Sequence, residues 1–173
     1  MKTLVDDEVH TDYGQMLVRS GEDVDFGLDD AFSGSEGVGL CGTAIAGNML
    51  LLTGMSYGGV GFLAELHDSR PTLDQTWEEI VEVSFRPLSE STRLWQWNSQ
   101  KWWDLGLQQS DYRVRYCAIG MDAARRMNNR DDGEPQTDRY LLQFWPAPPE
   151  PARVIKQTSA AAASSHESAH RAG

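Results

Sequence analysis

The side chains that could do acid–base or nucleophilic chemistry are few and widely spaced. Four histidines occur, and only His67 lies within sequence patterned for a folded element. A histidine beside an aspartate, here Asp68, could form half of a catalytic dyad. A surface histidine next to an aspartate that caps a turn is far commoner, and no serine lies on a strand-to-helix elbow. We therefore predict no catalytic residue and no enzymatic activity.

Three carboxylates, Glu78, Glu79 and Glu82, lie close together in the segment TWEEIVEVSFRP. Paired carboxylates act as acid and base in glycosidases. The β-branched residues of the segment favour a strand, and on a strand Glu78 and Glu79 point to opposite faces and cannot converge. We assign the three instead to a candidate partner-binding surface.

The sequence contains no recognisable metal or cofactor motif. Cys41 and Cys117 belong to no CxxC or Cys/His cluster, and both lie inside predicted strands, where a cysteine acts as a small buried hydrophobe. The glycine-rich stretch GMSYGGVG at 54–61 fits neither a P-loop nor GxGxxG, and a hairpin turn explains its glycines. We expect no cofactor and no bound metal.

Acidic residues are concentrated near the N-terminus. The net charge is −11, and residues 1–37 hold ten carboxylates against two basic side chains. Such a chain repels nucleic acid and suits a basic protein partner. The segment is either a solvated arm and loop or an acidic docking surface. For the second interpretation we assign these loop residues to partner binding: Asp23, Asp25, Asp29 and Asp30.

Four of the six tryptophans lie between Thr92 and Tyr116. Strand alternation places Trp95 and Trp97 on one face, and of the adjacent Trp102 and Trp103 one should face inward. The cluster can be core, a sugar-stacking face or a protein hot spot. We predict that Trp95 and one of the adjacent pair are core. Trp97 and Trp102 are the candidates for partner binding.

Short alternating segments recur along the chain and no long amphipathic helix is visible. This pattern favours an all-β domain, a single antiparallel β-sandwich of about seven to eight short strands, over an α+β domain. A long loop covers 21–37, with one helical turn at 28–32. The predicted strands lie within 12–20, 38–54, 58–69, 76–87, 91–99, 111–121 and 139–148.

The two ends of the chain differ from the middle in composition. Residues 1–11 predict a flexible lead, 12–147 the sandwich, and 148–173, which are rich in Pro, Ala and Ser, a disordered tail. The first residues lack the form of a signal peptide, and no apolar run is long enough to span a bilayer. We expect a cytoplasmic protein with reduced thiols.

The order of these segments resembles the competence protein J family, inhibitors of a DNA-uptake nuclease. The matching segments are, in order, DYGQMLVRS, the acidic loop with the strand pair after it, WEEIVEVSFRPLSESTRLWQWNS, KWWDLGLQQSDYRVRYCAIG and DRYLLQFWPAP. The resemblance covers about residues 10–147 and consists of pattern and order, with few identities. It implies a compact, non-enzymatic β-sandwich that binds and blocks a nuclease or similar toxin, an immunity-type role that suits an acidic protein.

Three functional hypotheses follow. The first is an inhibitor or immunity-type protein that blocks a basic partner through an acidic surface. The second is a carbohydrate- or small-ligand-binding sandwich that uses the tryptophans. The third is a structural or phage-related module. Nothing in the residues identifies the partner, the binding face or the oligomeric state.

Overall fold

The computed structural model describes residues 1–35, 37–96 and 101–172 and is mostly β-structure. Three helices accompany the strands: α1 (Leu28–Phe32), α2 (Met121–Met127) and α3 (Ala160–Ala172). The strands are β1 (Lys2–Asp12), β2 (Gln15–Ser20), β3 (Cys41–Gly42), β4 (Asn48–Leu52), β5 (Tyr57–Leu66), β6 (Glu79–Phe85), β7 (Thr92–Gln96), β8 (Trp102–Asp104), β9 (Tyr112–Ile119), β10 (Arg139–Pro146) and β11 (Arg153–Lys156).

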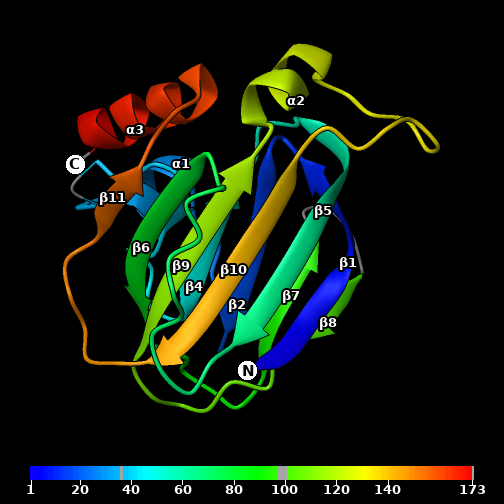
Figure 1. The fold of residues 1–173 in the computed structure, drawn as a ribbon. Coiled ribbons are helices and arrows are strands. Elements are labelled where there is room, and N and C mark those ends of the chain that lie inside the picture. Colours follow the sequence, from blue (N-terminus) through cyan, green and yellow to red (C-terminus); the bar gives the residue numbers. More distant parts are fainter. Residues whose placement is uncertain (36, 97–100, 173) are drawn as a thin grey trace.

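The strands form one curled, mixed sheet and not the two packed sheets of a sandwich. Its order is β11-β6-β9-β10-β5-β1-β2-β4-β3, with β7 and β8 joined on through β2. The β5–β10 pairing is parallel and all other named pairings are antiparallel. Figure 1 shows the sheet curling so that β2, β4 and β7 lie behind β9, β10 and β5, with the three helices at one end. The predicted sandwich is therefore wrong, because the continuous pairing through β5 and β1 replaces two separate sheets.

The main core fills the inside of the curl, and strand alternation places it there. Val81 and Val83 of β6 and Val114 and Tyr116 of β9 point inward and are buried. The other side of these strands carries a smaller buried cluster of Ile80, Cys117 and Leu141, which the 67–78 segment covers. The strands predicted within 76–87 and 111–121 are thus confirmed, as is the helical turn at 28–32. Every predicted strand segment contains an observed strand.

The predicted flexible lead is instead β1, which pairs with β5 over almost its whole length. Val5 and Val9 point inward and are buried, Asp6 and Glu8 point outward, and Asp7, on the side of the valines, stays exposed and accepts hydrogen bonds from Lys101 and Trp103 of the β8 region. The acidic run concealed this alternation in the sequence. A strand with one solvated face carries charge at no cost to the core.

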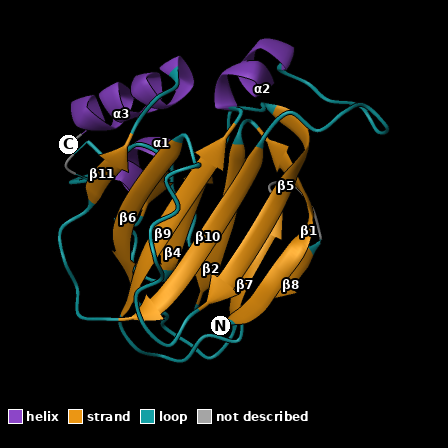
Figure 2. Ribbon diagram, in the orientation of Figure 1, coloured by secondary structure: helices purple, strands orange, loops and turns teal. Residues whose placement is uncertain are grey.

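The predicted disordered tail is also ordered. β11 pairs with β6, and α3 lies across the helical end of the molecule (Figure 2). Alanines allow this because they pack closely: Ala161, Ala162 and Ala169 are all buried. Gly39 completes the fit, since a Cβ there would stand 2.0 Å from the Ser165 carbonyl oxygen. Composition alone misses such contacts, because they depend on small size and not on large apolar side chains.

Candidate functional site

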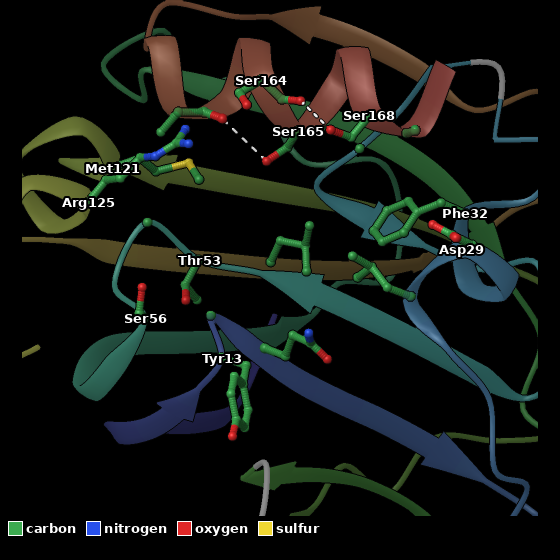
Figure 3. A pocket seen from close by; sticks show the side chains of 18 residues that line it. Tyr13, Asp29, Phe32, Thr53, Ser56, Met121, Arg125, Ser164, Ser165 and Ser168 are labelled. Atoms are coloured by element: carbon green, nitrogen blue, oxygen red, sulfur yellow. Dashed lines mark hydrogen bonds between the residues drawn. The ribbon is translucent and has the colours of Figure 1, made fainter. Parts of the chain in front are cut away.

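A cleft of about 260 Å³ lies at the helical end of the molecule. Its walls come from the β1–β2 turn, α1, the 52–56 segment, α2 and α3, so it gathers residues from both ends of the chain. Figure 3 shows α3 along one side and Tyr13 on the other, with Asp29 and Arg125 at opposite ends.

The β1–β2 turn presents an aromatic ring beside the cleft. Tyr13 and Gly14 have φ angles of 53° and 67°, and the Tyr13 side chain is 74 % exposed. The turn is fixed to the 53–56 segment, because the Gly14 N–H donates to the Ser56 carbonyl and the Thr53 N–H donates to the Gly14 carbonyl, both at 2.9 Å. Positive φ at a non-glycine aromatic residue is uncommon and costs free energy. The sequence prediction of one strand over 12–20 missed this turn, because Tyr-Gly is not one of the residue pairs typical of a two-residue hairpin.

The acidic loop forms the neighbouring wall. Buried Ala31 and Phe32 anchor α1 against the second core cluster, and this leaves Leu28 and Asp29 exposed at the cleft. All four carboxylates assigned to this loop are exposed. Two of them also have structural partners: Asp23 pairs with Arg19, and Asp30 accepts from the Gly27 N–H. The four exposed carboxylates are those of Asp23, Asp25, Asp29 and Asp30.

Helix α3 contributes small side chains to the cleft. The Ser165 and Ser168 hydroxyls donate to carbonyl oxygens of the preceding helical turn, at 3.2 and 3.0 Å. Such donors are already occupied, so these serines present mainly methylene and oxygen surface. On α2, Arg125 is exposed and supplies the one basic side chain among the lining residues. The cleft is therefore lined by small side chains of α3 and one charged side chain of α2, Arg125.

Glu82 does not belong to a binding surface, contrary to the sequence interpretation. Its side chain is 0 % exposed and accepts hydrogen bonds from Arg70, Arg115 and Arg153 at 2.6 to 3.2 Å. Burial raises the pKa of this carboxyl, but the hydrogen bonds from the three arginines outweigh it and hold the pKa below its usual value. Arg113, 2 % exposed, stands 3.9 Å away.

Glu79 is likewise internal, and Glu78 is only partly buried. The Glu79 carboxylate accepts the Thr158 and Ser159 N–H groups, with a shortest distance of 2.7 Å, and so fixes the approach to α3. Glu78 accepts the Gly120 N–H at 2.9 Å. Glu79 and Glu82 are therefore withdrawn from the candidate surface, because partners within the chain occupy their oxygens.

The described tryptophans of the 92–116 segment, Trp95, Trp102 and Trp103, are neither deeply buried nor fully open. Trp95 and Trp103, the two predicted to belong to the core, pack against the core clusters but are only partly buried. Trp102 is 40 % exposed, but Arg93 lies over its ring at 3.9 Å from the centroid. An occupied ring face is poorly placed for sugar stacking. Trp97 lies outside the described residues.

The chemistry-bearing residues do not converge in the described chain. His67 Nε2 lies 2.9 Å from Glu65 and not against the exposed Asp68, so the suspected dyad does not form. Within the ranges described, no group of three or more His, Cys, Asp or Glu side chains is placed to hold a metal ion. Across the same residues, no helix is long and apolar enough to cross a membrane. What the cleft offers is recognition by shape and charge.

The curled mixed sheet, with helices across one end, is the fold of a solved nuclease inhibitor. ComJ from Bacillus subtilis, described as the inhibitor of the DNA degrading activity of NucA, superposes with a TM-score of 0.57 at 18 % identity, over 84 % of this chain and 98 % of ComJ. The resemblance to the competence protein J family is thus confirmed for the fold. A crocagin biosynthetic gene J protein gives a TM-score of 0.46 at 12 % identity over 83 % and 99 %. No family model and no curated protein sequence matches.

Proposed function

We propose that this chain is a protein-binding inhibitor whose partner is a nuclease with a basic surface. The observation that carries the proposal is the fold shared with ComJ, which extends over 98 % of that chain. The exposed carboxylates beside the cleft support it, because a surface that binds DNA is basic and attracts an acidic partner. In this proposal the chain binds no nucleic acid itself and performs no catalysis.

The clustering of the carboxylates in one segment supports a defined contact with the partner over a general electrostatic attraction. Five carboxylates and no basic residue occupy 22–30, and this segment borders a cleft that can receive a side chain. Loops on a rigid sheet commonly carry recognition. A cytoplasmic location is part of the proposal, and the two free, buried cysteines are compatible with a reducing compartment.

The test is inhibition of DNA degradation. Purified NucA is assayed on linear DNA with increasing amounts of this chain, and we expect activity to fall to a plateau at one chain per nuclease. An unrelated acidic protein of similar net charge is the control and should inhibit only at low salt. If DNA degradation is unchanged at a large molar excess and no complex elutes on gel filtration, the proposal for NucA fails. A panel of other basic nucleases extends the same assay.

A further inference from the structure

The outer face of the sheet carries a local excess of positive charge, although the protein as a whole is acidic. At its centre is the buried Glu82 of β6, whose cross-strand neighbours are Arg115 on β9 and Arg153 on β11. The connection from β5 to β6 crosses this face (Figure 1) and adds Arg70. Ion pairs of 3.9 Å or less link four guanidinium groups with only two carboxylates, a set that will be called the arginine cluster: Arg70, Arg113, Arg115, Arg153, Glu82 and Glu150.

The carboxylate of Glu82 has no acceptor capacity left for the fourth arginine. Its two oxygens accept six hydrogen bonds from Arg70, Arg115 and Arg153, at 2.6 to 3.2 Å. A carboxylate offers about four lone-pair sites, so these donors already share them. Nη2 of Arg113 stands 3.9 Å from Glu82, beyond hydrogen-bond distance.

Arg113 is therefore incompletely compensated. Its Nη1 donates to Ser84 Oγ and to the Glu150 carbonyl oxygen, at 2.9 and 2.7 Å. Its Nε and Nη2 are buried and have no hydrogen-bond partner within the described residues. Burial lowers the pKa of Arg113 below its usual value; Glu82 and Glu150 act against this, and the charges of the other arginines add to it. A buried guanidinium with two unused donors has the capacity to stabilise a further negative charge nearby.

Arg70 and Arg153 make the arginine cluster accessible from solvent. Their side chains are 55 % and 43 % exposed, and both hold the same carboxylate, so their guanidinium groups lie close together. Among the described residues, Nε and Nη1 of Arg70 and Nη1 of Arg153 take part in no hydrogen bond. Guanidinium groups bind the oxygens of phosphate and carboxylate through paired N–H donors. Two adjacent guanidinium groups with an excess of two positive charges suit a compact dianion better than a monoanion.

We propose that an oxyanion of the phosphate type binds at the surface of the arginine cluster. Its oxygens accept from Arg70 and Arg153, and its charge compensates Arg113 beneath them. Because Arg70 belongs to the 67–78 connection and Arg153 to β11, the bound anion ties together two segments that cover the outer face. The net charge of −11 does not prevent binding, since charges more than about 8 Å apart are largely screened at physiological salt.

This site goes beyond the inhibitor function and does not depend on it. None of the four arginines lines the cleft at the helical end. The anion is recognised by its charge and its oxygens, so it is either free inorganic phosphate or the phosphate group of a nucleotide. The experiment below distinguishes these two sources and requires no nuclease.

The test is a titration of the isotopically labelled full chain with inorganic phosphate near neutral pH, at an ionic strength held constant with sodium chloride. We expect saturable shifts of the Arg70 and Arg153 amide resonances, with half-saturation on the order of 1 mM. Acetate, a monoanion, should bind at least about fivefold more weakly. Phosphate should also raise the urea midpoint of wild type more than that of Arg70→Gln, because its general effect as a salt is common to both proteins.

Two variants remove one guanidinium group each. Arg70→Gln and Arg153→Gln should weaken phosphate binding at least about tenfold, the effect of losing a charge-assisted hydrogen bond. Arg86→Gln is the matched control, because Arg86 is also exposed and pairs with a carboxylate outside the arginine cluster, that of Asp111 at 3.0 Å. It should stay within about twofold of wild type. Urea denaturation verifies folding, and if Arg153→Gln is unfolded, Arg70→Gln carries the comparison, because Arg70 belongs to no strand or helix.

The outcomes decide on the site and on its ligand. Shifts that do not saturate, or that are as large with chloride as with phosphate, would overturn the proposal. Equal weakening in Arg86→Gln would also overturn it, since only general attraction to positive charge would remain. Adenosine monophosphate that binds more tightly than phosphate identifies a nucleotide as the ligand, whereas equal or weaker binding identifies the phosphate group alone. Adenosine itself should cause no shift at Arg70 or Arg153.

Discussion

At the scale of single residues, the largest electrostatic feature is Glu82 on the outer face of the sheet. Cross-strand register lines up Glu82, Arg115, Gln143 and Glu65 on four neighbouring strands. Their side chains form one hydrogen-bonded row: Arg115 donates to Glu82 and to Gln143, and Gln143 donates to Glu65. A buried row of this kind specifies strand order, since any slip would leave charges unpaired.

Replacing Glu82 by glutamine should destabilise the fold strongly. The buried Arg115, and Arg113 beside it, would keep their charge and lose the carboxylate that compensates it. We expect a loss of about 3 to 5 kcal/mol in the free energy of unfolding, measured by urea denaturation. The control Glu90→Gln, at an exposed position, should change it by less than about 0.5 kcal/mol. A Glu82→Gln protein as stable as wild type would mean that the arginines are hydrated.

His166 should make stability fall as the solution is acidified. Its Nδ1 accepts the Gly39 N–H at 2.9 Å, and burial lowers the pKa of the ring below its ordinary 6.5. The unfolded chain therefore takes up the proton first, and the contribution of neutral His166 is present above pH 6.5 and lost as pH decreases below it. His166→Asn keeps an acceptor and removes the titration, so its unfolding free energy should depend less on pH between 5 and 7. The exposed His170, replaced in the same way, is the control; equal slopes for both variants would contradict the assignment.

Residue types and alternation predict the faces of these strands but not what covers them. The sequence predicts the strands that carry Glu82, Arg113 and Arg115, which the structure places on one side of the sheet. It could not show that backbone from the 67–78 segment accepts from Arg115, through Pro71 and Thr72, and so seals that side. The candidate surface failed for this reason at Glu82, and at Glu79 because the Thr158 and Ser159 N–H groups occupy its carboxylate. The acidic loop, which nothing covers, was correctly predicted to be exposed.

At the scale of elements, the C-terminal segment is the part that composition misjudged. The first backbone N–H groups of its helix, α3, donate to oxygen acceptors that the folded chain brings to them. The Asp122 carboxylate accepts the Ala160 and Ala161 N–H groups, and the Ser159 hydroxyl accepts the Ala162 N–H. Capping satisfies the free amides at a helix start and stabilises short helices, which are marginal in water even when rich in alanine. Because Asp122 lies far away in sequence, a local pattern cannot reveal this part of the cap, and Ser159 is the only local signal among these acceptors.

Truncation after Ala147 should therefore damage the protein. It removes β11 and α3, leaves the buried Glu79 carboxylate without its amide donors and opens one side of the cleft. An unsatisfied buried charged group alone costs more than about 1 to 3 kcal/mol. We expect a loss of at least about 3 kcal/mol in urea denaturation, with increased binding of a hydrophobic dye. A truncated chain with wild-type stability would restore the prediction of an independent tail.

At the scale of the whole molecule, the connectivity of the sheet lay beyond local patterns. The parallel β5–β10 pair joins residues far apart in sequence, and β2 is shared among β1, β4 and β7. Alternation gives each strand an inner and an outer side. The alternation pattern is the same in a sandwich and in a curled sheet, so it cannot distinguish the two architectures. The resemblance to the competence protein J family identified the right fold relative, although the sandwich expected with it was wrong. The order of segments along a chain can persist when few residues are identical.

The distribution of charge over the molecule leads to the last prediction, which concerns the rate at which a basic partner is captured. Replacing the four loop aspartates together by asparagine, at 23, 25, 29 and 30, keeps oxygen acceptors for Arg19 and for the Gly27 N–H. Stability should therefore change little, because the lost charges are exposed. Association with NucA, measured by stopped flow, should slow several-fold at low salt, and the difference should shrink as the screening length falls towards about 8 Å at physiological salt. Parallel salt dependences for the two proteins would show that the loop is only a solvated surface and that the partner is steered by other charges.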